Sequence, residues 1–310
     1  MIRKVLASVL VLASWVAGTI VGSIGAPAPA GAQALTVGRA HAEYLPALDG
    51  SQPIFILILG SDSRPGTPMD RGLADSIHIL GINPDAKRAT LYGIPRDSYV
   101  ALSTGGMDKI NAAMPQGGPP AEIATVEALT GITFDYYALT GFTGLIRAVD
   151  ELGGLTVDIP YTFAGAERVF EQGRRKLDGP SALGYARTRH GLIRGDFDRS
   201  LNQGRLVIAA LKQFKGDFAK DPSALYRWLG AGLRNVQTSL SIDELTRLAF
   251  LANLVNPKRV TNLVAYGGTA TVGGKSIVTL DPSNLALWQD LLQDGYILAK
   301  DIPAQFQPNP

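Results

Sequence analysis

The stretch Ile54–Leu59 reads IFILIL, a continuous run of six apolar residues. A run without polar alternation is typical of a strand that is buried on both faces of a sheet. Two further apolar runs follow at Ser76–Ile82 and Ala89–Ile94, and Asn83-Pro84-Asp85 between them predicts a turn. The three runs therefore predict three buried strands at the centre of the fold.

Along the rest of the chain, segments with helical spacing alternate with apolar runs. We expect helices over 119–129, 145–152, 182–186, 196–214, 225–233, 242–254 and 285–292, and strands over 134–139, 155–159, 260–266 and 276–280. Residues 164–180 are polar and contain glycine, which predicts a loop or hairpin, and Asp196 or Asp198 is expected to cap the helix that ends near 214. This alternation predicts an α/β protein, a single domain with a central mixed β-sheet covered by helices.

The N-terminal part of the chain differs from the rest. Two basic residues precede Val5–Ile24, which has no charge and would form about 30 Å of helix, enough to cross a bilayer. The APAPAGAQA stretch that follows has the Ala-x-Ala spacing of a cleavage site. Residues 1–34 are therefore a signal peptide or an N-terminal membrane anchor, and either one places the remainder outside the cytoplasm. We expect a linker over 35–52 and a Pro-rich tail over 301–310.

Charge and composition narrow the classes of function. The formal net charge is +2, yet residues 168–205 hold nine Lys or Arg against four Asp or Glu. This local basicity favours one anion site over a protein that binds nucleic acid along its length, and a secretory N-terminus disfavours nucleic acid further. The chain has no cysteine, which excludes a disulfide framework and thiolate metal sites. The three histidines stand singly, without the spacing of zinc ligands.

Charged residues stand where the three central strands end. Asp62 follows the first strand, Asp75 precedes the second and Arg96 follows the third. If the strands run up, down and up, these side chains meet at one edge of the sheet, where α/β proteins commonly place their sites. Each alone has a structural explanation as a loop residue. Together they favour a divalent cation, Mg²⁺ or Mn²⁺, held by the hard oxygen ligands of Asp62 and Asp75.

The stretch Tyr185–Arg205, YARTRHGLIRGDFDRSLNQGR, contains five arginines. Arg187 and Arg189 alternate across one residue, so in an extended or turn conformation both leave the same side of the chain. Arg199 and Gln203 are four residues apart and share a face of the next helix. Guanidinium forks near the positive end of a helix dipole suit phosphate oxygens. The alternative is a surface patch of arginines with incidental ion pairs.

Two carboxylates and several arginines fit phosphoryl transfer. A cation would bridge the carboxylates to a phosphate, and the arginines would neutralise the charge that develops on the leaving phosphate. The chain has no Gly-Lys-Ser/Thr loop to support nucleoside triphosphate chemistry, and no G-x-S-x-G elbow to mark acyl transfer.

At this point several motifs together resemble the LytR-CpsA-Psr (LCP) proteins, which attach glycopolymers to the bacterial cell wall. They are GSDSR at Gly60, Ala74-Asp75-Ser76, IPRDSYV at Ile94, KINAA at Lys109, and ARTRH followed by DFDRSLNQ. These motifs occur in family order over residues 53–215, within an expected LCP-like α-β-α catalytic domain over 53–300. The resemblance implies an extracytoplasmic, Mg²⁺-dependent phosphotransferase of the cell envelope. Such an enzyme moves a glycopolymer phosphate from a polyprenyl-pyrophosphate carrier to a peptidoglycan sugar hydroxyl.

The resemblance also implies roles for individual residues. Asp62 and Asp75 match the family's magnesium-binding acids, and its pyrophosphate contacts are matched by Arg96, Lys109, Arg187, Arg189, Arg199 and Gln203. Arg64 lies in the same motifs as a further candidate substrate contact. The candidate catalytic residues are Asp75, Arg96 and Asp97, with Asp75 or Asp97 as the base for the attacking hydroxyl.

Some alternatives stay open. The family fold implies a hydrophobic groove for the lipid chain, and Phe142, Leu145 and Ile146 either line it or belong to the ordinary core. The protein is alternatively a pyrophosphatase that acts on the same carrier with water as acceptor, or a non-catalytic binder of anionic wall polymer. The expected partners are a polyprenyl-pyrophosphate-linked glycopolymer, peptidoglycan and the membrane, and not nucleic acid.

Overall fold

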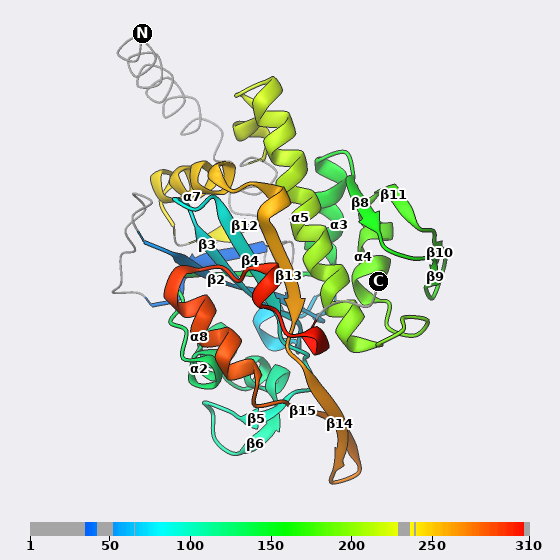
Figure 1. Ribbon diagram of the computed structural model, residues 1–310. Coiled ribbons are helices and arrows are strands. Elements are labelled where there is room, and N and C mark those ends of the chain that lie inside the picture. Colours follow the sequence, from blue (N-terminus) through cyan, green and yellow to red (C-terminus); the bar gives the residue numbers. More distant parts are fainter. Residues whose placement is uncertain (1–34, 42–51, 65, 229–235, 239, 307–310) are drawn as a thin grey trace. The chain divides into compact units, whose positions relative to one another are not determined.

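A seven-stranded mixed sheet forms the centre of the protein in the computed structural model (Figure 1). The structure describes residues 35–41, 52–64, 66–228, 236–238 and 240–306. The strands follow one another across the sheet in the order β12 (Val236–Thr238), β1 (Leu35–Arg39), β7 (Tyr136–Gly141), β2 (Ile54–Ser61), β3 (Ala74–Asn83), β4 (Arg88–Gly93) and β13 (Val260–Val264). The mixed central sheet expected from the sequence is confirmed.

The direction of the strands brings the predicted charged residues to one end of the sheet. β2 pairs with β3 and β3 pairs with β4, both antiparallel, and Ser61 lies opposite Ala74. The three central strands therefore run up, down and up. Asp62 after β2, Asp75 as the second residue of β3 and Arg96 after β4 therefore lie at the same end of the sheet.

Helices cover both faces of the sheet, as the α-β-α expectation requires. On one face, Leu57 and Ile79 join a core with α2 (Ala113–Thr130) and α8 (Asn284–Asp294). On the other, Ile54 and Ile82 join a core with residues of α7 (Ile242–Leu254), and Leu211 of α5 (Asp196–Lys220) packs against it. Residues that alternate along β2 thus belong to different cores, because successive side chains of a strand point to opposite faces.

A smaller layer packs against α5 and carries part of the candidate site. It contains α3 (Phe142–Glu151), α4 (Gly179–Arg187) and the antiparallel pair of β8 (Leu155–Ile159) and β11 (Gly173–Leu177). Their apolar side chains form a separate core with Leu206 and Ala209 of α5. β9 (Phe163–Ala164) and β10 (Val169–Phe170) form a hairpin that begins one residue before the loop or hairpin expected over 164–180, and β11 and the start of α4 occupy the later part of that range. Two further hairpins are β5 (Tyr99–Ala101) with β6 (Met107–Lys109), and β14 (Gly267–Val272) with β15 (Lys275–Leu280).

Capping residues explain several helix boundaries. Asp178 caps α4, since its side chain accepts a hydrogen bond from the Ser181 N–H. Ser241 and Glu244 form a capping box at the start of α7. α5 differs from the expectation, because its N-cap is Gly195 and no side chain caps it. Asp196 and Asp198 instead lie in the first helical turn, where negative charge is stabilised by the helix dipole.

The predicted linker and tail are both wrong in part. Leu35–Arg39, expected in a linker over 35–52, is strand β1 and pairs antiparallel with β7. Phe306, expected in a tail over 301–310, is 1% exposed and packs against Tyr266, with ring centroids 5.6 Å apart. Short apolar segments such as these gain order from the sheet and core on which they pack.

The prediction for residues 1–34 lies outside the described residues, as does the end of the helix expected over 225–233. The described residues all belong to one compact unit by their internal contacts. Within the described part of the chain, no helix is both long and apolar enough to cross a membrane.

Candidate active site

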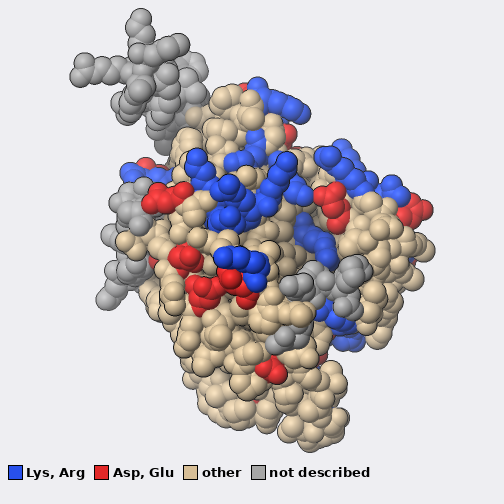
Figure 2. Space-filling model, in the orientation of Figure 1, with Lys and Arg blue, Asp and Glu red and all other residues tan. Residues whose placement is uncertain are grey.

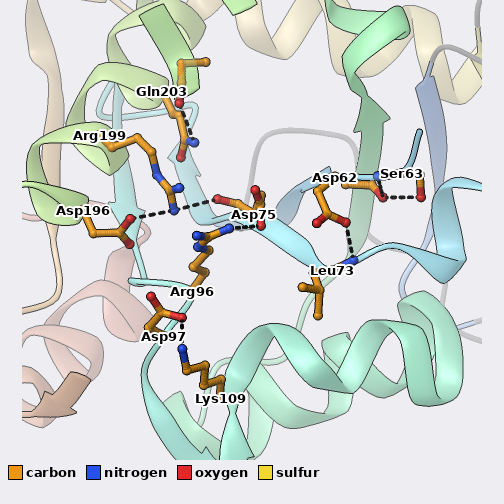
Figure 3. Close-up of polar contacts among 12 residues, drawn as sticks. Asp62, Ser63, Leu73, Asp75, Arg96, Asp97, Lys109, Asp196, Arg199 and Gln203 are labelled. Carbon is orange, nitrogen blue, oxygen red and sulfur yellow. Dashed lines mark hydrogen bonds and ion pairs between the residues drawn. The ribbon is translucent and has the colours of Figure 1, made fainter. Parts of the chain in front are cut away.

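The loop between β2 and β3 is closed by Asp62 and Leu73. The Asp62 N–H donates to the Leu73 carbonyl at 3.0 Å, and the Leu73 N–H donates to Asp62 Oδ1 at 2.8 Å (Figure 3). Both bonds extend the pairing of the two strands by one step beyond Ser61 and Ala74. They hold Asp62 at the same end of the sheet as Asp75, the second residue of β3.

Asp75 is the meeting point of two arginines from different parts of the chain. Its Oδ1 pairs with the guanidinium of Arg96, and its backbone carbonyl accepts a hydrogen bond from Arg199 Nη2 at 3.3 Å (Figure 3). Arg199 also pairs with Asp196 Oδ1 at 2.9 Å, one turn earlier in α5. Residues separated by as many as 124 positions therefore share one charged cluster.

Burial makes this cluster electrostatically costly without a ligand. The side chain of Arg199 is 6% exposed, and the Nε atoms of both Arg96 and Arg199 are buried without a hydrogen-bond partner. Oδ2 of Asp196 is also buried and unpaired. A buried charged group with unused hydrogen-bonding capacity is destabilising. An anion with several acceptor oxygens would supply partners for the two guanidinium groups, whereas the Asp196 oxygen is itself an acceptor and would need a donor or a cation.

Burial shifts the pKa of the carboxyl and guanidinium groups of the cluster in opposite directions, and the neighbouring charges oppose these shifts. Burial raises the pKa of Asp196, against the opposing effect of Arg199. Burial likewise lowers the pKa of Arg199, against Asp196. At Arg96 burial lowers the pKa, but the neighbouring charges of Asp75, Asp196 and Asp97 outweigh burial and raise it. Arg96 is thus the guanidinium that the surrounding carboxylates stabilise most clearly.

Lys109 approaches the same region from β6. Its Nζ lies 2.8 Å from Asp97 Oδ1, and Asp97 directly follows Arg96 (Figure 3). The backbone joins the two segments as well, since the Ile110 N–H donates to the Ser98 carbonyl at 2.8 Å. The IPRDSYV and KINAA motifs therefore meet in space as well as in sequence order.

Arg187 and Arg189 leave the end of α4 on the exposed side, with Thr188 buried between them. The Arg187 guanidinium lies 4.5 Å from the ring centroid of Phe142. Arg189 acts electrostatically on both Asp196 and Arg199, so it belongs to the same cluster. The expectation that both arginines leave one side of the chain agrees with this pattern of exposure.

Two other predicted substrate contacts are placed differently. Gln203 Nε2 donates to the Ala186 carbonyl at 3.1 Å and so holds the end of α4, where Arg187 lies, to α5. Arg64 is exposed, and the described residues give its guanidinium no ion pair. The structure therefore brings Gln203 to the edge of the cluster, and it shows no contact between the Arg64 side chain and the cluster among the described residues.

The start of α5 packs closely on the sheet because the residues between them are small or polar. His78 of β3 is buried, and its Nε2 lies 3.0 Å from the Ser200 carbonyl and its Nδ1 3.1 Å from Ser76 Oγ. Burial lowers the pKa of His78 to about 4, so its imidazole is neutral near pH 7. A methyl group at Gly93 would collide with Ser200 Oγ. This close contact fixes the height of Arg199, the residue next to Ser200, above Asp75.

Asp62 and Asp75 are the residues that could hold a divalent cation at this site. Asp62 and Asp75 each use only Oδ1 in the bonds described above, which leaves Oδ2 of both for a cation. Hard oxygen donors without sulfur or histidine suit Mg²⁺ or Mn²⁺. In the described part of the chain, no group of three His, Asp or Glu forms a metal site alone. The remaining ligands would therefore be phosphate oxygens and water, as is common for Mg²⁺.

Sequence reasoning missed the position of Asp196 and the burial of His78. Asp196 was expected only as a possible helix cap, although its position three residues before Arg199 is the spacing of a helical ion pair. Of the three residues considered for a lipid groove, Leu145 packs against the smaller core, and Phe142 lies under Arg187.

Comparison with known proteins gives a consistent result. The chain is 34% identical over 228 residues to the polyisoprenyl-teichoic acid–peptidoglycan teichoic acid transferase TagU of Oceanobacillus iheyensis. The aligned residues cover 71% of this chain and 68% of that protein. The crystal structure of Bacillus subtilis TagV is similar with a TM-score of 0.66 and 30% identity, over 79% of this chain and 97% of that one. Protein gbs0355 from Streptococcus agalactiae is similar with a TM-score of 0.70 and 27% identity, over 84% and 94%.

The matches reach across the domain but not the full length of the curated relatives. The aligned part is 68% of the length of the Oceanobacillus iheyensis TagU, 63% of a TagU of Bacillus mycoides and 64% of the full-length Bacillus subtilis TagV. The LytR_cpsA_psr family profile matches residues 32–293, which include every residue of the charged cluster. On this evidence the chain belongs to the LytR_cpsA_psr family.

Proposed function

We propose that this protein is a phosphotransferase that moves a glycopolymer phosphate from a polyprenyl-pyrophosphate carrier to a sugar hydroxyl of peptidoglycan. The observation that carries the proposal is the buried pair of Arg96 and Arg199, whose Nε atoms lack acceptors. A diphosphate has enough oxygens to satisfy both and to neutralise the excess positive charge of Arg187 and Arg189. The name of the relative TagU states the same class of transfer, with teichoic acid as the polymer.

The reaction is a displacement at the phosphorus that bears the glycopolymer. The acceptor hydroxyl oxygen forms a bond to this phosphorus, the bond to the bridging oxygen breaks, and polyprenyl phosphate leaves with the electron pair. Arg96 and Arg199 act at this point, because charge that develops on the leaving phosphate is stabilised by fixed guanidinium groups in a water-poor site. Their position is held by Asp75 and Asp196 before any substrate binds.

The hydroxyl must lose its proton to a base as it attacks. Of the two candidate bases, Asp75 already pairs with Arg96 through one oxygen, and the proposal assigns its other oxygen to the cation. Asp97 has no metal to bind in this proposal, and only its Oδ1 pairs with Lys109. We therefore assign the base to Asp97 and metal binding to Asp75.

Asp62 and Asp75 would hold Mg²⁺, or Mn²⁺, through their Oδ2 atoms. A cation bound there would polarise the phosphate oxygens and offset the repulsion between the diphosphate and the two carboxylates. We also propose that the protein works outside the cytoplasm at the membrane, where its lipid donor resides. The apolar segment Val5–Ile24, with two basic residues before it, supports this location.

The test uses the full-length chain in detergent with Mg²⁺, a polyprenyl-pyrophosphate-linked glycopolymer and peptidoglycan. The expected products are polyprenyl phosphate and wall-linked polymer in equal amounts. Asp62→Asn and Asp75→Asn should reduce turnover by at least about 10²-fold, while the lipid still binds through the arginines. Lipid monophosphate without wall-linked polymer would identify a pyrophosphatase, and no lipid monophosphate at all would refute the transferase.

A further inference from the structure

A second group of cations lies at the opposite end of the sheet from the active site. The turn 84–87 joins β3 to β4 and carries Lys87, and β4 begins at Arg88. Because β3 runs for ten residues from the active-site end, this turn lies about 30 Å from Asp75. The group is therefore separate from the arginines that would hold a diphosphate.

Three segments bring these cations together. The backbone of Lys87 accepts a hydrogen bond from the Asn256 N–H at 3.0 Å, which places the turn beside Lys258 and Arg259. Lys215 of α5 reaches the same place, since its Nζ donates to the Asn253 carbonyl and its pKa is lowered by burial and then by Lys87. We call the five residues Lys87, Arg88, Lys215, Lys258 and Arg259 the far basic cluster.

No carboxylate in the part of the chain that the structure describes pairs directly with the far basic cluster, although the exposed Asp85 lies in the same turn as Lys87. Among the described residues, none of its five members forms an ion pair with a carboxylate. Arg88 instead lies over the ring of Tyr296, 5.4 Å from the centroid. Lys87, Lys258 and Arg259 are exposed. Figure 2 shows Lys and Arg side chains gathered over this part of the surface, near the upper end of β13 and the C-terminal part of α5.

The backbone at Lys87 gives a second reason to look for a ligand. Its φ is 56°, the only positive value at a non-glycine position in the described part of the chain. This left-handed conformation costs other residues about 1 kcal/mol relative to glycine. A lysine therefore occupies a position where glycine would be more stable and where a cation adds to the repulsion among its neighbours.

We propose that the far basic cluster binds a polyanionic wall glycopolymer, one with phosphate or carboxylate groups along its chain. The inference rests on the proposed function for its choice of partner. A lipid donor must present its diphosphate at the active-site end, so the opposite end of the sheet faces away from the bilayer and toward the wall. Exposed cations without carboxylate partners suit a flexible polyanion, which can contact several of them at once.

The experiment measures binding of poly(glycerol phosphate) and of uncharged dextran to the full-length chain in detergent. Lys258→Ser/Arg259→Ser should weaken binding of the polyanion about five-fold, the combined effect of two exposed charge contacts. Lys87→Gly should weaken it about two-fold while leaving the protein at least as stable, because glycine adopts this φ freely. Dextran should bind no variant, and binding should weaken with salt.

Lys275→Ser/Lys300→Ser is the matched control, because both lysines are exposed and lie outside the cluster. Equal loss in the control, or no loss in the cluster variants, would overturn the proposal. So would stronger cluster-dependent binding to phosphatidylglycerol vesicles than to the polyanion. Transfer of a sugar phosphate to peptidoglycan from a carrier that bears one uncharged sugar in place of the polymer should be unchanged in the cluster variants. An inactive wild-type chain would refute the transferase proposal, but the binding comparison would still test the far basic cluster independently.

Discussion

Two glycines of α5 allow a direct test of how the fold positions the active site. A methyl group at Gly204 would collide with the side-chain oxygen of Asn262 and lie 2.8 Å from its Cγ and 3.0 Å from its Nδ2. A shift of the Asn262 side chain would break the hydrogen bond that its Nδ2 donates to the Leu201 carbonyl at 2.9 Å. Gly216, on the same helix, has nothing within 4 Å of the position that a methyl would take.

The same substitution should therefore stabilise the protein at Gly216 but not at Gly204. Alanine in place of glycine inside a helix gains about 1 kcal/mol, so Gly216→Ala should raise the free energy of unfolding by about that amount. At Gly204 this gain is opposed by overpacking against Asn262, which costs about 1–3 kcal/mol. The difference between the two variants isolates the overpacking term, about 1–3 kcal/mol, or roughly 2–12 °C in Tm.

The assay combines urea and thermal unfolding with kcat/KM for polymer transfer. Gly204→Ala should also lower kcat/KM, because α5 can relieve the collision only by moving away from β13, and Arg199 moves with it. Gly216→Ala should leave kcat/KM unchanged. Equal stability changes in the two variants, or a stable Gly204→Ala protein with full activity, would refute the idea that close packing of α5 sets the position of Arg199.

Three further predictions concern buried or paired groups. Burial lowers the pKa of His78 from 6.5 in the unfolded chain to about 4, so stability should fall by up to about 3 kcal/mol as pH drops from 6.5 to 4. His78→Gln should flatten this part of a plot of urea midpoint against pH, and an unchanged slope would contradict the assignment. Burial raises the pKa of Glu122 from 4.5 to about 8, so stability should be lost as pH rises through that interval. Glu122→Gln keeps the acceptor for the Met114 N–H and should be more stable than wild type at pH 8, by roughly 4 kcal/mol at most. Equal unfolding curves of the two proteins at that pH would count against the raised pKa of Glu122. Phe142→Leu should raise KM for the lipid donor about 2- to 5-fold, because the contact with Arg187 is lost, whereas Phe142→Tyr keeps an aromatic ring and should leave KM unchanged. An equal KM in both variants would argue against this contact.

The parts of the site that lie beside strands were predictable from sequence. Asp62, Asp75 and Arg96 flank apolar runs whose lengths and intervening turns imply antiparallel order, and antiparallel order alone places them together. Asp196 was not predictable in the same way. Its spacing to Arg199 indicated an ion pair on one helix, but nothing local showed that this helix begins above Asp75.

The expected linker and tail show the same limit of sequence-based prediction for the fold. Leu35–Arg39 has too few residues for a clear strand pattern, and it becomes a strand because it pairs with β7 on one side and β12 on the other. Phe306 is buried because Tyr266 and the core on which it packs are present. Such segments take their structure from partners that are distant in sequence.

Taken by itself, the amino-acid sequence determined the central strands, the helices around them and the motifs that carry charge, because apolar periodicity and turn residues act over a few neighbouring positions. Only the tertiary structure decided that Arg199 is buried, that Asp196 accompanies it and that five cations gather at the far end of the sheet. Burial and electrostatic repulsion depend on which distant residues pack together. The 124 positions between Asp75 and Arg199 are closed by the fold, not by any local pattern.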